Sequence, residues 1–600
     1  MSSRAAKNGP NYFNQSDSED AVDWTTGPRN VPVTPAFGRE KQEYQAKASS
    51  EKAKQDYFGL CPSLKGNVIS ATFTIPHILY RKGKQVERDT GHGFWQSGHF
   101  DCLSHLTNSR VTSQHIVVAW PGEIIQSGAN SPPSSATPTP TSIAPDGHAQ
   151  NNDDPNPDRV VFVSTEEQEQ LETDLRQGRE HIIPVWLCAA TGRKENGIEL
   201  QNQSRWRRYA EHDLYPLFHY KQREPTGGGD ERARWNDYHF VSEAFANKIC
   251  AVYKPGDTIL VHDFYLMLLP GMLRQRLPSA RIAFLLQTPF PTSEFVRCLP
   301  HRRELLEGVL GADLVAFQAP LYAEHFANSC ARILQARGSG PEQVLYRGQR
   351  TQLAHIPTGF DIQQITQRAF HPDVDKLCEE VRDSFSGKRI ILGHDPVSSL
   401  SGLDKKLLAY DRFLRDHPEW RGRVVLVQLT SPAALADAGA EEADFAARIS
   451  LLVGDVNARH GSLGHTPVQL SPLPPRRDEY LALLRRSDVA LVTSVRQGIS
   501  TTALEYAACQ RDDACGTLVL SELSGTAAGA LGAAVVINPW DVATVADAIY
   551  DALTATREDR AARHEALRGQ VQDMSVESWA AKLFGMLDRI PKKDDNHEAV

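Results

Sequence analysis

Two carboxylates in this sequence lie where a carboxylate is unusual. Glu505 sits in the apolar run ALEYAAC (503–509), and because an unpaired buried carboxylate is costly, it predicts either a ligand contact or a salt bridge. Asp263 stands at a predicted strand-to-helix junction, where its side chain either binds a ligand or caps a helix. Both residues are therefore candidate binding residues.

Metal chemistry is not indicated by the sequence. His219, His262 and His355 have no metal-ligand spacing, so we expect structural or surface roles for them. The nine cysteines are scattered, odd in number and without a CxxC pair, which favours reduced and mostly buried thiols. We expect no metal and no other cofactor.

Residues 257–331 predict three strand-helix units in succession. Short apolar runs at 258–261, 281–286 and 314–317 are each followed by an amphipathic segment of helix length. This alternation is typical of a parallel sheet with crossover helices, which places the chain in the α/β class.

The second half of the chain repeats the alternation. A helix is predicted at 404–417, and the predicted strands lie at 388–393, 423–429, 488–494, 516–522 and 533–539. Two parallel-sheet halves of similar length predict two Rossmann-like domains that face a cleft. Because ligands of open parallel sheets bind at the carboxyl ends of the strands, we expect the site to line that cleft.

Composition suggests the domain boundaries. Residues 1–64 are polar with little periodic apolar content, which predicts a disordered arm. Residues 126–159 are rich in Pro, Ser, Thr and Asn and predict a solvent-exposed insertion. The two Rossmann-like domains are expected at 65–360 and 361–574, and residues 575–600 as a terminal helix with a charged tail.

Bulk properties exclude two classes of partner. The formal net charge is -9 and the pI is near 6.2, so the chain has no overall attraction to nucleic acid or anionic membranes. It contains no run of about 18 apolar residues, and its N-terminus has no apolar signal core. We expect a cytoplasmic protein.

HDFYLMLLP (262–270), TPFPTSE (288–294), RCLPHRRELLEGVLGADLVAFQ (297–318) and LEYAACQ (504–510) together resemble trehalose-6-phosphate synthases, glycosyltransferase family 20. The similarity runs from about Gly66 to about Leu587. It implies a GT-B fold. In active members it also implies metal-free transfer of glucose from UDP-glucose to glucose 6-phosphate with retention.

The chain departs from the family where the donor diphosphate is bound. Negative charge develops on the leaving diphosphate, so active members stabilise it with basic side chains. Where the family has VDRLDYTKG, this chain has HDPVSSLSG (394–402), with Pro396 at the arginine position and Ser401 at the lysine position. The resemblance therefore implies that both diphosphate cations are absent.

Other substrate positions also differ from the family. Thr74 stands at the acceptor-phosphate arginine, Gln287 at the histidine of HTPFP, Gln497 at the aspartate of RDGMN, and Tyr265 in HDYHL. DTGHGFWQSGHF (89–100) replaces the glycine-rich loop. A neutral amide can still bind a sugar hydroxyl, but it lacks the charge-assisted bond of a carboxylate.

Five positions match the family. The resemblance assigns Arg496, Gly498 and Glu505 to the nucleotide-sugar side, with Glu505 on the ribose, and Trp120 and Asp263 to the acceptor side. Trp120 also fits simple core packing.

The basic contacts that are missing would contribute enough to catalysis to favour one hypothesis, an inactive synthase-like chain. One charge-assisted contact is worth about 1.5–3 kcal/mol, and a single basic finger on a phosphoryl group about 10³–10⁵ in rate. With three basic positions missing, we expect little synthase activity and assign no catalytic residue. No DxDGT-type phosphatase motif occurs either.

Three hypotheses follow. The chain resembles the regulatory or non-catalytic subunits of fungal trehalose synthase complexes, which implies catalytic synthase or trehalose-phosphatase chains as partners. An active transferase is the alternative, with Arg496, Lys405 and Lys406 as compensating cations near the space of Pro396 and Ser401. A third possibility is a sensor that binds UDP-glucose or a sugar phosphate without turnover.

Overall fold

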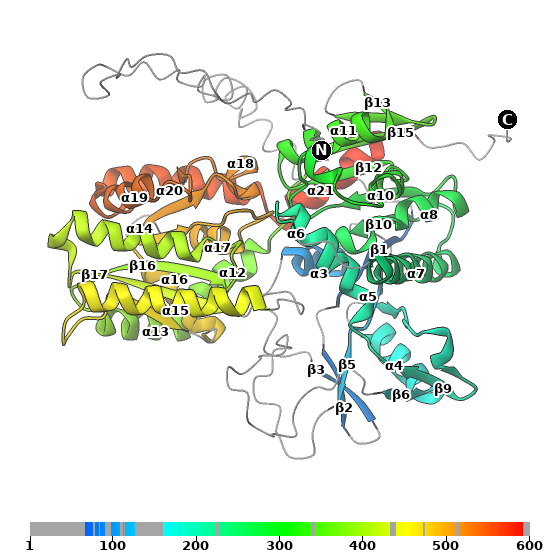
Figure 1. Ribbon diagram of the computed structural model, residues 1–600, viewed down its shortest axis with the longest axis horizontal. Helices are drawn as coiled ribbons and strands as arrows, with labels where there is room; N and C mark the ends of the chain where they lie inside the picture. The colour runs from blue at the N-terminus through cyan, green and yellow to red at the C-terminus, as the bar shows by residue number, and fades with distance from the viewer. Residues whose placement is uncertain are drawn as a thin grey trace, which may run out of the picture. The chain divides into compact units, whose positions relative to one another are not determined.

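The computed structural model describes residues 66–75, 78–82, 85–89, 98–108, 112, 114–126, 160–178, 181–222, 228–338, 342–431, 440–471, 475–511 and 515–591 (Figure 1). The predicted arm, residues 127–159 of the predicted insertion and residues 592–600 of the tail lie outside the described residues.

The first half is built on a nine-stranded sheet in the order β13-β14-β15-β12-β11-β10-β1-β4-β7. The strands are β13 (Arg337–Gly338), β14 (Gln343–Tyr346), β15 (Gln349–His355), β12 (Leu314–Phe317), β11 (Arg281–Leu285), β10 (Thr258–His262), β1 (Val68–Thr72), β4 (His115–Ala119) and β7 (Ile182–Pro184). The pairings from β15 to β7 are parallel, and β13, β14 and β15 pair antiparallel at one edge. The three predicted strands within 257–331 are confirmed as β10, β11 and β12.

The second half is built on a six-stranded sheet in the order β18-β17-β16-β19-β20-β21, in which every pairing is parallel. The strands are β18 (Val468–Ser471), β17 (Val424–Ser431), β16 (Arg389–Pro396), β19 (Val489–Val492), β20 (Thr517–Ser521) and β21 (Val535–Ile537). All five strands predicted for this half are confirmed, and β18 adds a sixth.

Two small sheets accompany the first half. One has the order β3-β2-β5, with β3 (Gln85–Asp89), β2 (Ile78–Lys82) and β5 (Ile124–Gln126). The other has the order β6-β9-β8, with β6 (Val161–Ser164), β9 (Gly197–Leu200) and β8 (Arg193–Lys194). The strand-like run at 159–164 therefore pairs antiparallel with β9 and does not join the main sheet.

Helices fill the crossovers between the strands. In the first half they are α3 (Gly98–Asn108), α4 (Thr165–Gln177), η1 (Ala190–Gly192), α5 (Arg205–Arg208), η2 (Tyr209–Leu214), α6 (Tyr215–Phe218), α7 (Gly228–Val252), η3 (Phe264–Leu266), α8 (Leu269–Arg276), α9 (Ser293–Val296), α10 (Arg302–Val309), α11 (Pro320–Ser329) and η4 (Cys330–Leu334). In the second half they are α12 (Ile362–Ala369), α13 (Pro372–Ser384), α14 (Leu403–Asp416), η5 (Pro418–Trp420), α15 (Ala440–His460), α16 (Arg477–Arg486), α17 (Thr501–Cys509), α18 (Gly525–Gly529), α19 (Val542–Thr554) and α20 (Arg557–Gln572), followed by α21 (Val576–Arg589).

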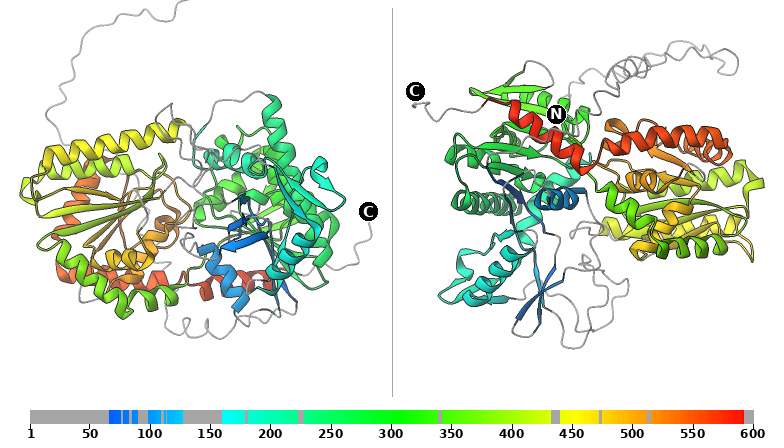
Figure 2. Two further views of the ribbon diagram at one scale, coloured as in Figure 1. Left: turned by 90° about the horizontal axis from the view of Figure 1, so that it is seen from below. Right: turned by 180° about the vertical axis from the view of Figure 1, so that it is seen from behind.

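Successive side chains along the strands of the second sheet point to opposite faces, so its core is divided into two layers. Ile390 and Leu392 of β16 pack with α12, α13, α16, α17 and α20, whereas Ile391 packs with α14, α15 and α19. Figures 1 and 2 show these helices on the two faces of the sheet. Because both faces are covered, the strands read as continuous apolar runs, which is why they were visible in the sequence.

The predicted terminal helix is confirmed as α21, and it packs on the first sheet. Trp579, Leu583 and Phe584 lie in one buried cluster with Leu260 of β10 and Leu314 of β12. The chain therefore returns to its first half after completing the second sheet.

Glycines allow α8 and α10 to cross closely. A Cβ added at Gly308 of α10 would lie 2.6 Å from the Met267 carbonyl oxygen and 2.8 Å from the Leu268 Cα. Both atoms belong to the backbone and cannot turn away as a side chain can. Only glycine fits this crossing without a shift of the helices.

We predict that Gly308→Ala lowers the free energy of unfolding by about 1–3 kcal/mol, because the added methyl group forces the two helices apart. Thermal unfolding followed by circular dichroism measures the effect as a lower melting temperature. Gly569→Ala in α20 is the matched control, since its Cβ meets open space. The control should be unchanged or up to about 1 kcal/mol more stable, because alanine favours helix. Equal melting temperatures for the two variants would contradict the packing argument.

Candidate functional site

The end of β16 and the loop after it carry the two positions where the resemblance places the diphosphate cations. β16 continues to Pro396, which is exposed and pairs in register with Ser431 of β17. The Ser401 hydroxyl donates to the Ser398 carbonyl at 2.6 Å and accepts from the Leu403 amide at 3.3 Å. Ser401 is thus buried at the start of α14, where it holds the turn.

Lys406 is buried under the same loop. Its side chain has no exposed surface, and its ammonium donates to the Asp395 carboxylate. Gln428 of β17 donates to the same carboxylate oxygen at 2.9 Å. Because breaking such a pair would leave an uncompensated buried charge, Lys406 is held in the core of the second half.

The other two candidate compensating cations also have partners. The Lys405 ammonium lies 4.1 Å from the centroid of the Trp540 ring and 3.1 Å from Asp404. The Arg496 guanidinium lies 4.3 Å from the centroid of the Tyr220 ring. Each of the three cations proposed for an active transferase therefore has a partner within the protein, and the partner of Lys406, Asp395, directly precedes Pro396.

A carboxylate lies beside the loop instead. Ser398 donates its hydroxyl to Glu442 of α15 at 3.2 Å, and the Lys221 ammonium lies 3.8 Å from the same carboxylate oxygen. Sequence reasoning missed Glu442, because no motif connects α15 to a loop 44 residues earlier. A carboxylate at this place disfavours a diphosphate by charge repulsion.

Glu505 is buried in α17 with both oxygens engaged. The Arg477 guanidinium lies 2.6 Å from Oε1, and the Tyr480 hydroxyl donates to Oε2 at 2.9 Å. Burial raises the pKa of the carboxyl group, while the charge of Arg477 opposes the rise. The structure therefore contains the salt bridge that the sequence left open for Glu505, and its assignment to the nucleotide-sugar side stays a prediction. Sequence reasoning missed Arg477.

Residues 496–498 form a contact between the segment after β19 and the segment after β11. A Cβ at Gly498 would lie 2.0 Å from the Gln287 carbonyl oxygen, so only glycine fits. The Gln497 carbonyl accepts from the Tyr322 hydroxyl at 3.4 Å and from the Gly525 amide at 2.9 Å. The structure therefore places Gln497 and Gly498 in close packing with residues of the first half.

On the acceptor side, a chain of neutral groups links Gln287 to Thr74. Gln287 Nε2 donates to His99 Nδ1 at 2.9 Å, and His99 Nε2 lies 2.9 Å from the Thr72 hydroxyl, which donates to the Thr74 carbonyl at 3.2 Å. Burial lowers the pKa of His99 to about 4, so the ring is neutral at pH 7. The Thr74 residue is exposed. His99, which lies in the segment that replaces the glycine-rich loop, was not singled out from the sequence.

Asp263 has an unusual backbone conformation. Its φ of 66° and ψ of 175° lie in a region that glycine prefers, and such strain is concentrated at functional sites. Asp263 is the N-cap residue of η3, but its carboxylate makes no side-chain capping bond and accepts from the Gln287 backbone amide at 3.1 Å. Burial raises the pKa of this carboxyl group to about 6.

Trp120 and Tyr265 both pack against Phe73. The Trp120 ring lies 4.9 Å from Phe73 in the buried core, which agrees with its packing interpretation. The Tyr265 ring stacks on Phe73 at 4.6 Å, and its hydroxyl donates to Glu211 at 3.0 Å.

Asp101 of α3 is a further buried carboxyl group near these residues. It accepts a hydrogen bond from the Asp361 amide at 3.2 Å. Burial raises its pKa to about 6, and the nearby charges of Asp361 and Glu505 act in the same direction.

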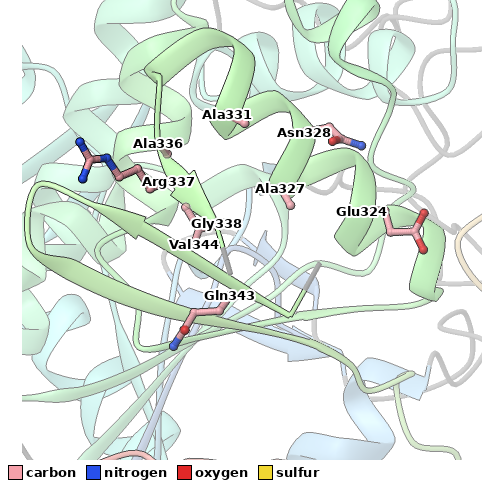
Figure 3. Close-up of a pocket in the computed structure, with 9 residues that line it drawn as sticks. All are labelled: Glu324, Ala327, Asn328, Ala331, Ala336, Arg337, Gly338, Gln343 and Val344. Carbon is pink, nitrogen blue, oxygen red and sulfur yellow. The ribbon is translucent and has the colours of Figure 1, made fainter. Parts of the chain in front are cut away.

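Two pockets lie on the surface of the described part of the protein. One of about 430 Å³ lies between α11, η4 and the β13–β14 hairpin, with Ala327, Ala331 and Val344 in its wall and Glu324 and Arg337 at its margin (Figure 3). A second, of about 590 Å³, is lined in part by Arg477. The first pocket contains none of the predicted site residues.

Within the described ranges, no group of three or more His, Cys, Asp or Glu side chains could hold a metal ion. Eight cysteines of the described part are free thiols, and six of them are buried. The described helices include none with the length and apolar character that a membrane crossing requires.

Known proteins resemble this chain over most of its length. The model of glycosyltransferase family 20 matches residues 150–589. Trehalose-phosphatase of Saccharomyces cerevisiae is 32% identical over 564 residues, which are 90% of this chain and 60% of that protein. Alpha,alpha-trehalose-phosphate synthase [UDP-forming] of Yarrowia lipolytica is 36% identical over 383 residues, 63% of this chain and 80% of that protein.

Solved structures agree with the fold. The N-terminal domain of Candida albicans trehalose-6-phosphate phosphatase has a TM-score of 0.72 at 32% identity and covers 88% of this chain and 97% of its own. An Escherichia coli structure bound with UDP-2-fluoro glucose has a TM-score of 0.67 at 22% identity, covers 88% and 100%, and supports the fold alone. These likenesses confirm the predicted GT-B fold. The chain spans only 53–60% of the first two curated relatives.

We predict that Asp101→Asn flattens the pH dependence of stability. Because its pKa is raised from near 4 to about 6 in the fold, the folded state holds the proton more tightly than the unfolded chain. Stability from this group is therefore full below about pH 4 and is lost as the pH rises to about 6. The variant should lose this decline and be more stable at pH 7 by about 1–3 kcal/mol.

Urea unfolding at a series of pH values measures this effect. Asp551→Asn, at an exposed position of α19, is the matched control and should follow the unmodified protein. If Asp101→Asn and the unmodified protein decline in parallel between pH 4 and 6, the assignment to Asp101 is wrong.

Proposed function

Because the chain belongs to glycosyltransferase family 20, we propose that it acts in trehalose biosynthesis as a catalytically impaired regulatory or structural subunit. Its partners would be catalytic trehalose-phosphate synthase chains, trehalose-phosphatase chains or both. Its place of action would be the cytoplasm.

One observation carries this proposal. Where the family binds the leaving diphosphate with an arginine and a lysine, this chain has Pro396 and Ser401, and the Glu442 carboxylate accepts from Ser398 in the loop between them. The cations that could substitute are engaged: Lys406 with Asp395 and Arg496 with the Tyr220 ring. The Lys221 ammonium near this loop lies 3.8 Å from the Glu442 carboxylate, so a negatively charged leaving group would have to compete with Glu442 for it.

The size of the missing interactions favours a nearly complete loss of transferase activity over a modest decrease. Each missing charge-assisted contact removes about 1.5–3 kcal/mol, and stabilisation of the phosphoryl charge is the main contribution to such reactions. The missing contacts act as a unit and are not additive. A loss of roughly 10³-fold or more in rate is the expected scale.

The relatives support the partner part of the proposal. They include proteins named as trehalose-phosphate synthases and as trehalose-phosphatases. The chain also matches nearly all of the N-terminal domain of the Candida phosphatase. A chain of this architecture without its own transferase chemistry would serve such enzymes as a binding platform.

We predict that the pure chain releases no UDP from UDP-glucose and glucose 6-phosphate above background in a coupled assay. The double variant Pro396→Arg, Ser401→Lys should bind UDP at least about tenfold more tightly, because it regains two charge-assisted contacts. It should still turn over slowly, since Gln287, Gln497 and Thr74 are unchanged. Isothermal calorimetry measures the binding and the coupled assay the turnover.

A charge-matched control distinguishes binding of UDP at the restored site from general attraction of UDP to added positive charge. The double variant Leu408→Arg, Leu451→Lys adds the same charge at exposed positions of α14 and α15 and should leave UDP binding unchanged. Turnover by the unmodified chain at rates typical of enzymes, about 1 s⁻¹ or more, would refute the proposal and favour the active transferase.

A sugar-binding sensor is the second candidate, and the strained Asp263 favours it. Its raised pKa and glycine-like backbone persist on the acceptor side although the family's acceptor-phosphate arginine is Thr74 here. A neutral sugar moiety could still be held by Asp263 and Gln287 without turnover.

We predict that trehalose 6-phosphate and UDP-glucose at millimolar concentration raise the melting temperature by less than about 1 °C if the chain is only a platform. A ligand that prefers the folded state must raise it. A larger rise in melting temperature that disappears in the Asp263→Asn variant would favour the sensor over the platform. Glucose 1-phosphate serves as the ligand control.

A further inference from the structure

One side of α15 is covered by no described element. The helix packs on the second sheet through Phe445, Ile449 and Val456. On its other side Leu451 is 71% exposed, which is high for a leucine in the middle of a 21-residue helix. Figures 1 and 2 show α15 as an outer helix of this sheet.

The surroundings of Leu451 suit a second helix. Ala447, Gly454 and Ala458 lie four residues before it and three and seven after it, and all are exposed. Residues at these spacings share one face of a helix. Their small side chains would let a neighbouring helix approach closely around Leu451.

Four charged residues border this face on one flank. They are Asp444, Arg448, Asp455 and Arg459, and all are exposed. At 100° per residue they fall within a sector of about 60° beside Leu451. Asp444 and Arg459 lie equally far from the midpoint between residues 451 and 452, and so do Arg448 and Asp455.

From this symmetry we infer that α15 is a self-association surface, and that its partner is α15 of a second copy of this chain in antiparallel orientation. A two-fold axis through that midpoint would bring the same flank of both helices together. Asp444 would face Arg459 of the other copy and Arg448 its Asp455, four ion pairs in all. A parallel arrangement would instead set like charges against each other.

The charges are available for such pairs. In the described structure neither Asp444 nor Asp455 has an ion-pair partner, although an arginine lies four residues further along the helix in each case. Arg448 lies over the Phe445 ring of its own helix. Arg459 also contacts Asp411 but keeps 49% of its side chain exposed. An unrelated protein would match this alternation only by chance, whereas a second copy matches it by symmetry.

The interface would be small. A single helix pair falls at or below the lower end of specific interfaces, roughly 1,200 Å² in total, so we expect weak association that depends on concentration and salt. The inference does not depend on the proposed loss of catalysis, because α15 meets its copy through the side opposite the sheet.

Sedimentation velocity of the full chain over about 1–100 μM tests the inference. The unmodified protein should dimerise, and Leu451→Asp should remove the dimer. Arg448→Asp should weaken it by about tenfold, since it turns two attractive pairs into repulsive ones. The charge swap Arg448→Asp with Asp455→Arg should restore it to within about threefold.

Arg563→Asp, at an exposed position of α20, is the matched control and should leave the dimer unchanged. Circular dichroism verifies that each variant folds. A monomer at all concentrations, a dimer that survives Leu451→Asp, or a failure of the charge swap to restore association would each overturn the inference.

Discussion

Charge buried in a protein must be paired, and this constraint organises the second half of the molecule. Asp395 ends its central strand with Lys406 and Gln428 as partners, and Glu505 is satisfied by Arg477 and Tyr480. Side chains of the chain itself therefore pair both buried carboxylates.

The same internal pairing fixes the contact between the two halves. Gly498 lies against the Gln287 backbone, and Arg496 lies over the Tyr220 ring. Gln287 in turn donates to His99 through its side-chain amide and to the Asp263 carboxylate through its backbone amide. The acceptor side and the segment after β19 are therefore connected by short contacts. A substitution at Gln287 would therefore alter contacts both on the acceptor side and in the segment after β19.

The strands could be predicted from the sequence, whereas the tertiary contacts of the candidate site residues could not. Runs such as 314–317 were recognisable because both faces of a parallel sheet are covered, so every residue is apolar. The salt bridge of Glu505 was left open because Arg477 precedes it by 28 residues on another helix. His99, Glu442 and the backbone of Asp263 were missed or misread for the same reason. Each depends on contacts that only the tertiary structure creates.

The positions at which the resemblance places phosphate-binding residues lie outside the apolar core. Pro396 is exposed, Thr74 is exposed, and Ser401 replaces a charge by hydrogen bonds within its own turn. The buried clusters on both faces of the two sheets contain none of these residues. At the two exposed positions a long flexible cation would give up side-chain entropy on being ordered. Small residues at these positions therefore leave the apolar clusters of both sheets intact, so the architecture of the family does not depend on cations there.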